Sequence, residues 1–138
     1  MQNVSFHIQS KEDKIIPEHF MCIILEQYVM KYHKVCVMCN DEKQSKILSN
    51  HIWSFPPSGF MPHQCKDNMI ITEGFFKHKS VINMSKNPVL NIKTQIIELV
   101  FNDAQSINEA RDRFKIYKTN GFKLTHIKED KFQCQQQA

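Results

Sequence analysis

Hydrophobic residues in this chain follow two spacings, and the change from one to the other marks the expected elements. Residues 3–9 alternate apolar and polar side chains, which predicts a first strand. Residues 17–33 have a helical spacing, and the proline at position 17 suits the first turn of a helix. Residues 34–39 are apolar on both faces, as expected of an interior parallel strand.

The rest of the chain continues this alternation of strands and helices. Asn40 or Asp41 can cap a helix whose inward face would include Ile47, Leu48 and Ile52. The later elements expected from the pattern are strands at 68–72, 80–84 and 95–101, a helix at 106–120 and a last strand at 123–127.

This order of elements predicts an α/β fold. Strands that alternate with helices at this spacing form a three-layer, mostly parallel sheet with right-handed crossovers and helices on both faces. We expect a single domain over residues 1–130, because the chain is long enough to bury one core. Residues 131–138 are polar and predict a disordered tail.

Composition narrows the class of protein further. The chain has 138 residues, of which 41% are hydrophobic and 23% charged, which excludes a disordered protein. The formal net charge of +4 is mild and predicts a local basic patch with an acidic partner. We find no signal peptide and no apolar run of membrane-spanning length. Five cysteines, an odd number, favour reduced thiols and a cytoplasmic location.

Motifs for catalysis and cofactor binding are missing from the sequence. The chain has only three glycines, Gly59, Gly74 and Gly121, and none opens a helix after the first strand, so no functional nucleotide-binding loop is expected. Cys36 and Cys39 resemble a redox or zinc pair in spacing, but residues three apart in a strand point to opposite faces. The histidines show no spacing typical of zinc ligands. We therefore expect no cofactor, no metal and no catalytic residues.

The last predicted helix combines basic and aromatic residues. Arg111, Lys115 and Lys118 recur at helical spacing and form a ridge beside an apolar stripe that includes Phe114. Asn120 and Gly121 then stop the helix, and Phe122 can fold back toward Phe114 and frame an apolar pocket. Such a site suits a free carboxylate and an acidic segment that ends in an aromatic residue.

A second candidate surface is the segment 53–63. It carries Trp53, Phe60 and Met61 together with three prolines, which stiffen the loop and lower the entropy lost when a partner docks. Aromatic anchors on a rigid loop are typical of an interface. About half of its large apolar groups should instead cover the end of the preceding helix, with Trp53 or Phe60 left to contact a partner.

Three segments together resemble the chi subunit family of bacterial DNA polymerase III. They are Val-Cys-Val-Met-Cys-Asn-Asp-Glu-Lys-Gln at 35–44, the 53–63 loop, and Ala-Arg-Asp-Arg-Phe-Lys-Ile-Tyr-Lys with the following Gly-Phe at 110–122. Their order and spacing also agree with that family. The resemblance implies a Rossmann-like fold without a working nucleotide site. It also implies a non-catalytic accessory protein of the clamp loader, active in DNA replication.

The resemblance also implies partners and site residues. Arg111, Phe114, Lys115, Lys118 and Phe122 would form a pocket for the acidic C-terminal tail of the single-stranded DNA-binding protein. The family often has Tyr or Trp at position 114 and Arg at position 118, so this chain lacks a ring hydroxyl and a planar cation there.

On the opposite side, the resemblance implies that Trp53, Phe60 and Met61 would face the psi subunit. In some relatives that face also binds an accessory helicase. The chain would contact DNA only indirectly, and no membrane.

Two alternatives remain open from the sequence. The basic residues interleaved with Phe114, Tyr117 and Phe122 could stack bases and neutralise phosphates, as in a module that binds single-stranded nucleic acid directly. Glu109 and Asp112 count against that hypothesis. Cys39, which precedes a predicted helix N-terminus, could be the thiol of an enzyme, and rapid alkylation at neutral pH would support that role.

Overall fold

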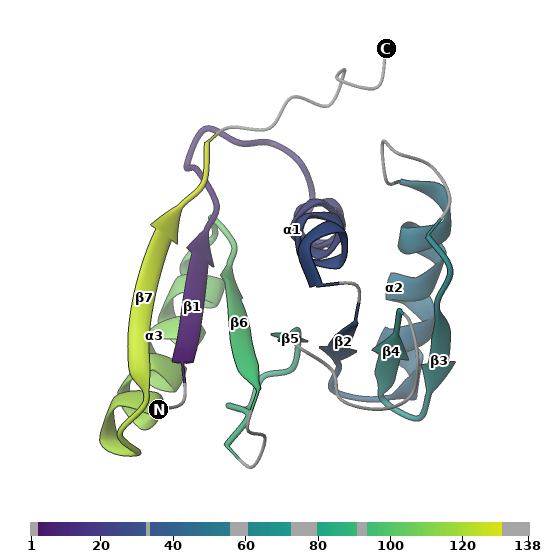
Figure 1. Cartoon of the computed structure of the whole chain (residues 1–138). Coiled ribbons are helices and arrows are strands. Elements are labelled where there is room, and N and C mark those ends of the chain that lie inside the picture. Colours follow the sequence, from purple (N-terminus) through teal and green to yellow (C-terminus); the bar gives the residue numbers. More distant parts are fainter. Residues whose placement is uncertain (1–2, 33, 56–60, 73–79, 91–93, 131–138) are drawn as a thin grey trace.

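The fold is a seven-stranded sheet with helices on both faces (Figure 1). The computed structural model describes residues 3–32, 34–55, 61–72, 80–90 and 94–130. In chain order the elements are β1 (Asn3–Ile8), α1 (Pro17–Tyr32), β2 (Val35–Met38), α2 (Glu42–Ser54), β3 (Gln64–Lys66), β4 (Met69–Ile71), β5 (Ser80–Asn83), β6 (Gln95–Val100), α3 (Ala104–Thr119) and β7 (Lys123–Lys128). The predicted tail at 131–138 lies outside the described residues.

The sheet is mostly parallel, which confirms the predicted fold class. Its strand order is β3-β4-β2-β5-β6-β1-β7. The pairs β2–β5, β5–β6, β6–β1 and β1–β7 are parallel, whereas β2–β4 and β3–β4 are antiparallel. Parallel neighbours require crossover connections. The helices α1 and α3 lie within the connections from β1 to β2 and from β6 to β7, whereas the described part of the β5–β6 connection holds no helix.

Two apolar clusters lie on opposite faces of the sheet. The larger cluster packs α1 and α2 against the sheet and includes Phe20, Leu25, Leu48, Val37 and Ile82. The smaller cluster packs α3 against β1 and β6 through side chains such as Phe6, Ile96 and Tyr117. In Figure 1, α3 lies behind β1 and β7, whereas α1 and α2 lie to the right of β6. None of the described helices has the length and apolar character needed to cross a bilayer.

The structure corrects three sequence expectations. The strand β3 was not expected, because none of its three residues is buried and its sequence, Gln-Cys-Lys, lacks the apolar alternation of a strand. The strand β2 is interior but has one antiparallel neighbour, β4. On α2, Ile47 is 45% exposed. Ser45 and Ser49 complete its buried face with Leu48 and Ile52, at spacings of three and four residues, and Asp41 is the N-cap.

The carboxyl ends of β1 and β6 are closed by the protein's own side chains. The Gln9 side chain donates to the Ile15 carbonyl oxygen and accepts from the Asn102 backbone N–H. The Asn102 side chain in turn donates to the carbonyl oxygens of Ser10 and Asp13. In open α/β sheets this crevice, where the helices switch faces, is the usual ligand site. Here these hydrogen bonds hold the β1–α1 turn across it.

Candidate functional site

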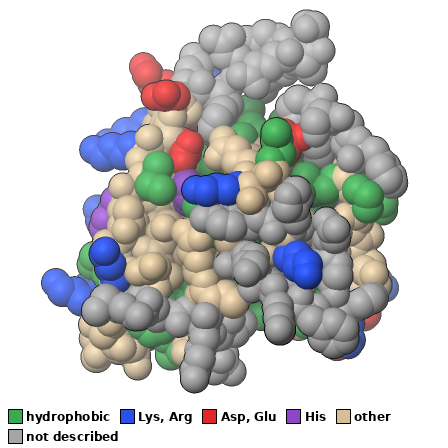
Figure 2. All heavy atoms as spheres, viewed as in Figure 1, with side chains coloured by type: hydrophobic (Ala, Val, Ile, Leu, Met, Phe, Trp, Pro, Cys, Tyr) green, Lys and Arg blue, Asp and Glu red, His purple; other side chains and the backbone are tan. Residues whose placement is uncertain are grey.

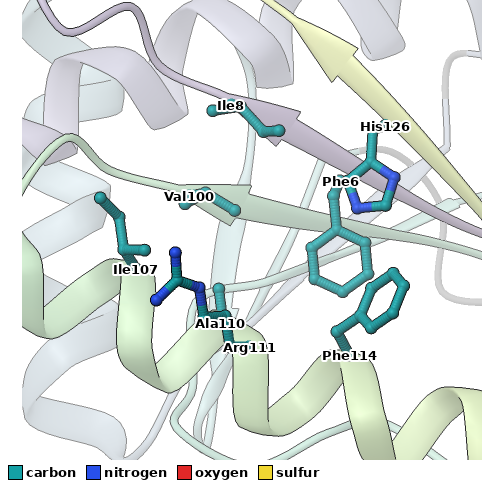
Figure 3. Close-up of a pocket in the computed structure, with 8 residues that line it drawn as sticks. All are labelled: Phe6, Ile8, Val100, Ile107, Ala110, Arg111, Phe114 and His126. Carbon is teal, nitrogen blue, oxygen red and sulfur yellow. The ribbon is translucent and has the colours of Figure 1, made fainter.

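A cavity of about 390 Å³ lies between α3 and the adjoining strands (Figure 3). Its walls come from β1, β6, α3 and β7, and the lining side chains are those of Phe6, Ile8, Val100, Ile107, Ala110, Arg111, Phe114 and His126. Six of these eight residues are apolar, and none is acidic. The cavity can therefore bind an apolar group, with the Arg111 guanidinium beside that group.

Three rings in mutual contact form one wall of this cavity. The Phe6 ring lies 5.7 Å from that of Phe114 and 5.7 Å from that of His126, measured between centroids. The Phe114 and His126 rings are 5.1 Å apart. Because the three residues come from β1, α3 and β7, their mutual packing fixes the width of the cavity at this end.

Of the basic ridge predicted on α3, only Arg111 lines the cavity. Arg111 lines the cavity from α3, and Figure 3 shows its guanidinium between Ile107 and Ala110. Lys115 and Lys118 follow on the same helix and are exposed. A helical spacing of four and three residues places the three cations along one side of α3.

The structure places Phe122 beside Tyr117. Its ring lies 5.2 Å from the Tyr117 ring, and its backbone N–H donates to the Tyr117 carbonyl oxygen at 3.1 Å. Gly121 has φ +82°, the left-handed conformation that ends the helix as expected. Phe114 instead packs against Phe6 and His126. Phe122 was predicted to lie near Phe114, but its ring contacts Tyr117, about one turn further along α3.

Phe6 and His126 were not predicted as site residues. Both lie on strands, and the sequence gives no indication of which strands adjoin the last helix. The pairing register places Phe6 opposite His126, which brings both side chains to the same face of the sheet. The sequence predicts a strand at 123–127, but not that this strand pairs with the first one. Without that pairing, Phe6 and His126 cannot be assigned to one site.

A buried carboxylate anchors the inner side of α3. Glu98, on β6, is fully buried and accepts hydrogen bonds from Arg113 Nε at 2.9 Å, the Tyr117 hydroxyl at 2.6 Å and Asn83 Nδ2 at 2.7 Å. Burial raises the pKa of the Glu98 carboxyl, and the neighbouring Arg113 guanidinium opposes that shift. Burial and the Glu98 carboxylate also raise the pKa of Tyr117. The network fixes α3 against β6 beneath the cavity.

On the other face of the sheet, the second predicted surface divides into core and exposed residues. Trp53, at the end of α2, is 46% exposed, and its ring lies 4.2 Å from that of His63. Met61 is only 6% exposed and packs in the larger apolar cluster. Because this side chain fills the core, its burial counts against the expected contact of Met61 with a partner. Phe60 lies outside the described residues.

The thiols of Cys36, in β2, and of Cys39, directly after it, are unsuited to nucleophilic chemistry. Cys39 is 1% exposed, and burial, with smaller contributions from Cys36, Cys65 and Asp41, raises its pKa to about 12. Burial also raises the pKa of Cys36 to about 11. A reactive cysteine needs an exposed thiolate, so these values oppose the thiol hypothesis. Within the described ranges, no group of three potential metal ligands comes together.

Comparison with known proteins identifies the family. A model of the family described as DNA polymerase III chi subunit, HolC, matches residues 1–125. The DNA polymerase III subunit chi of Pseudomonas aeruginosa is 25% identical over 135 residues, which cover 90% of this chain and 94% of that protein. These matches place the α/β domain in the class of accessory subunits of the bacterial replicative polymerase. The chain belongs to the DNA polymerase III chi subunit family.

Proposed function

We propose that this chi-family protein is a non-catalytic adaptor at replication forks in the bacterial cytoplasm. It would bind the acidic C-terminal tail of the single-stranded DNA-binding protein with one surface and the psi subunit of the clamp loader with another. The observation that carries the first contact is the apolar cavity that Arg111 lines and that no acidic residue lines. Lys115 and Lys118 extend its positive charge along α3.

The cavity's chemistry matches the end of an acidic chain with a terminal aromatic residue. The terminal ring would enter the space bounded by Phe6, Phe114 and Ile107, where its burial is favourable. Arg111 would hold the free carboxylate through two hydrogen bonds, a geometry that a guanidinium allows and an ammonium does not. Lys115 and Lys118 would attract the preceding acidic residues at the exposed rim, where each contact contributes less.

The second contact would use the exposed end of α2. Trp53 is partly exposed on the face opposite α3, and His63 packs against its ring. A partly exposed aromatic side chain that a neighbouring ring supports is typical of an interface anchor. The two proposed surfaces lie on opposite sides of the sheet, so both partners can be bound at once (Figure 1). An accessory helicase is a further candidate partner for the α2 surface.

Direct binding of single-stranded nucleic acid is the alternative. In Figure 2, which views the face opposite α3, the Lys and Arg side chains of the described residues appear as separate groups. On α3, Asp112 is exposed next to Arg111, which weakens any attraction for a phosphate backbone. The specific feature of the α3 side is an apolar cavity, which suits one inserted side chain better than a row of stacked bases.

A fluorescence-anisotropy titration tests the proposal. The probe is a labelled acidic peptide that ends in Ile-Pro-Phe with a free carboxylate, compared with its C-terminal amide and with a labelled single-stranded oligonucleotide. We expect micromolar binding of the free acid, loss of about tenfold or more on amidation, and a similar loss in Arg111→Ala.

The matched control is Lys46→Ala, which removes an exposed cation from α2 on the opposite face. This variant should bind the peptide like the unmodified protein. Equal affinity for the acid and the amide, together with tight, salt-sensitive binding of the oligonucleotide, would replace the adaptor function with nucleic-acid binding.

A further inference from the structure

The strand β7 ends the described sheet on the side of the cavity. It pairs with β1 along all six of its residues, and the strand order places no described strand on its other side. Immediately after it, the Glu129 N–H donates to the Ile8 carbonyl oxygen. Because backbone groups alternate in direction along a strand, the N–H and C=O groups of Leu124, His126 and Lys128 point to the outer edge. An extended chain could pair there.

This outer edge adjoins the cavity. The register pairs His126 with Phe6 and Lys128 with Ile8, and both Phe6 and Ile8 line the cavity. Paired residues of neighbouring strands project to the same face, so His126 and Lys128 lie on the side of α3. A chain whose end enters the cavity can therefore continue along β7.

The edge is also basic. Lys123 and Lys128 begin and end the strand, both are exposed, and no acidic residue lies between them. Across the cavity, α3 contributes the positive charge of Arg111. The chemistry of both walls therefore favours a negatively charged occupant.

We propose that an acidic, extended peptide segment adds to the sheet as an eighth strand along the outer edge of β7, with its carboxyl-terminal residue in the cavity. This inference rests on the proposed function and specifies how the acidic stretch is held. Backbone hydrogen bonds would supply affinity that is independent of the peptide's side chains, and Lys123 and Lys128 would select for acidic ones.

A second copy of the chain is a poorer occupant of the same edge. Lysines on an edge strand oppose self-pairing, and each end of β7 carries one. An acidic peptide turns the same lysines into favourable partners.

The first experiment uses the acidic free-acid peptide in singly N-methylated versions, one backbone nitrogen at a time. N-methylation removes one donor and adds bulk at that position, but it leaves every side chain and the terminal carboxylate intact. A peptide paired with β7 should lose about five- to tenfold in affinity at every second position, with small effects between. A flat profile with undiminished binding would overturn the added strand while leaving the proposed function standing.

The second experiment compares Lys128→Pro with Lys128→Ala. Both remove the ammonium, but only proline removes the outward N–H, while the inward N–H of Glu129 that bonds to Ile8 remains. The proline variant should bind the peptide about fivefold more weakly than the alanine variant, with equal thermal stability. Equal affinities would overturn the proposal.

Two further outcomes are informative. If the unmethylated free-acid peptide does not bind at all, the proposed function fails and the strand addition fails with it. If sedimentation shows a dimer of the unliganded chain that Lys128→Pro dissociates, the edge belongs to a second copy, and the peptide proposal is wrong.

Discussion

Arg113 and Glu98 form an ion pair inside the protein, with Arg113 Nε 2.9 Å from Glu98 Oε1 and the carboxylate fully buried. Arg113 stands two residues after Arg111 on α3, so one helix carries a cation that faces inward and a cation that lines the cavity. The two arginines should therefore respond to mutation in different ways.

Arg113→Met should reduce the free energy of unfolding by about 3–5 kcal/mol, because it leaves the buried Glu98 charge without its partner. Arg111→Ala should change stability by no more than about 0.5 kcal/mol while weakening peptide binding. Urea unfolding and peptide titration on both variants check that one variant loses stability and the other loses peptide affinity. Adding Glu98→Gln to Arg113→Met should recover part of the lost stability, and no recovery would contradict the assigned cause.

Tyr117→Phe removes a hydroxyl that donates to Glu98 at 2.6 Å and accepts from the Val89 backbone N–H at 2.9 Å. Two buried groups lose a partner, so we expect a loss of about 1–3 kcal/mol in the free energy of unfolding. Chemical denaturation measures it. Trp53→Phe, on the exposed end of α2, is the control and should change stability by less than about 0.5 kcal/mol.

Met61→Ala and Trp53→Ala should separate the core from the proposed psi-facing surface. Met61 is buried, so its truncation leaves a cavity and should lower the free energy of unfolding by about 2–5 kcal/mol. Trp53→Ala should leave stability nearly unchanged and weaken capture of psi in a pull-down assay. Undiminished capture of psi by Trp53→Ala would remove Trp53 from that surface.

Alkaline pH should destabilise the protein through its buried thiols. Burial raises the pKa of Cys22 and Cys39 to about 12 and that of Cys36 to about 11, from an ordinary value of 9.0. In the window between 9 and those values, the unfolded state loses protons that the folded state keeps, so stability falls as pH rises. At pH 10 each thiol should contribute a loss of about 1 kcal/mol, which urea unfolding at pH 7 and pH 10 can measure.

Cys36→Ala should flatten part of this pH dependence, and an unchanged slope would contradict the thiol mechanism. Alkylation of Cys39 in the native protein at neutral pH should be slow, because the side chain is both buried and protonated.

Most elements of the fold were predictable because their apolar spacing is regular. The strand β1 and the helices α1 and α3 begin and end within one or two residues of their predicted positions. The strand β3 could not be found, since an exposed three-residue edge needs no apolar residue. The position of Ile47 was misjudged because serines occupy buried positions of α2, where packing overrides the polarity of the side chain.

The candidate site was predictable only where it lies on one helix. Arg111 and Phe114 share α3, so helical spacing alone was enough to associate them. Phe6 and His126 join the site through strand pairing between residues 120 positions apart, and the sequence gives no signal for that register. The partner of Arg113 could not be identified from the sequence for the same reason, because Glu98 is simply the single charged residue of an apolar strand.

The anchoring of α3 by Glu98 has a kinetic consequence. Because the inner face of the helix is already held by Arg113 and Tyr117, we expect the cavity wall to be in place before any ligand arrives. The conformational entropy lost on binding would then come mainly from the peptide, and binding would need no rearrangement of the domain. Differences in affinity between tail sequences should appear mainly as differences in dwell time. If the proposed partner is correct, a short dwell time would let the protein exchange one single-stranded DNA-binding protein for the next as a replication fork advances.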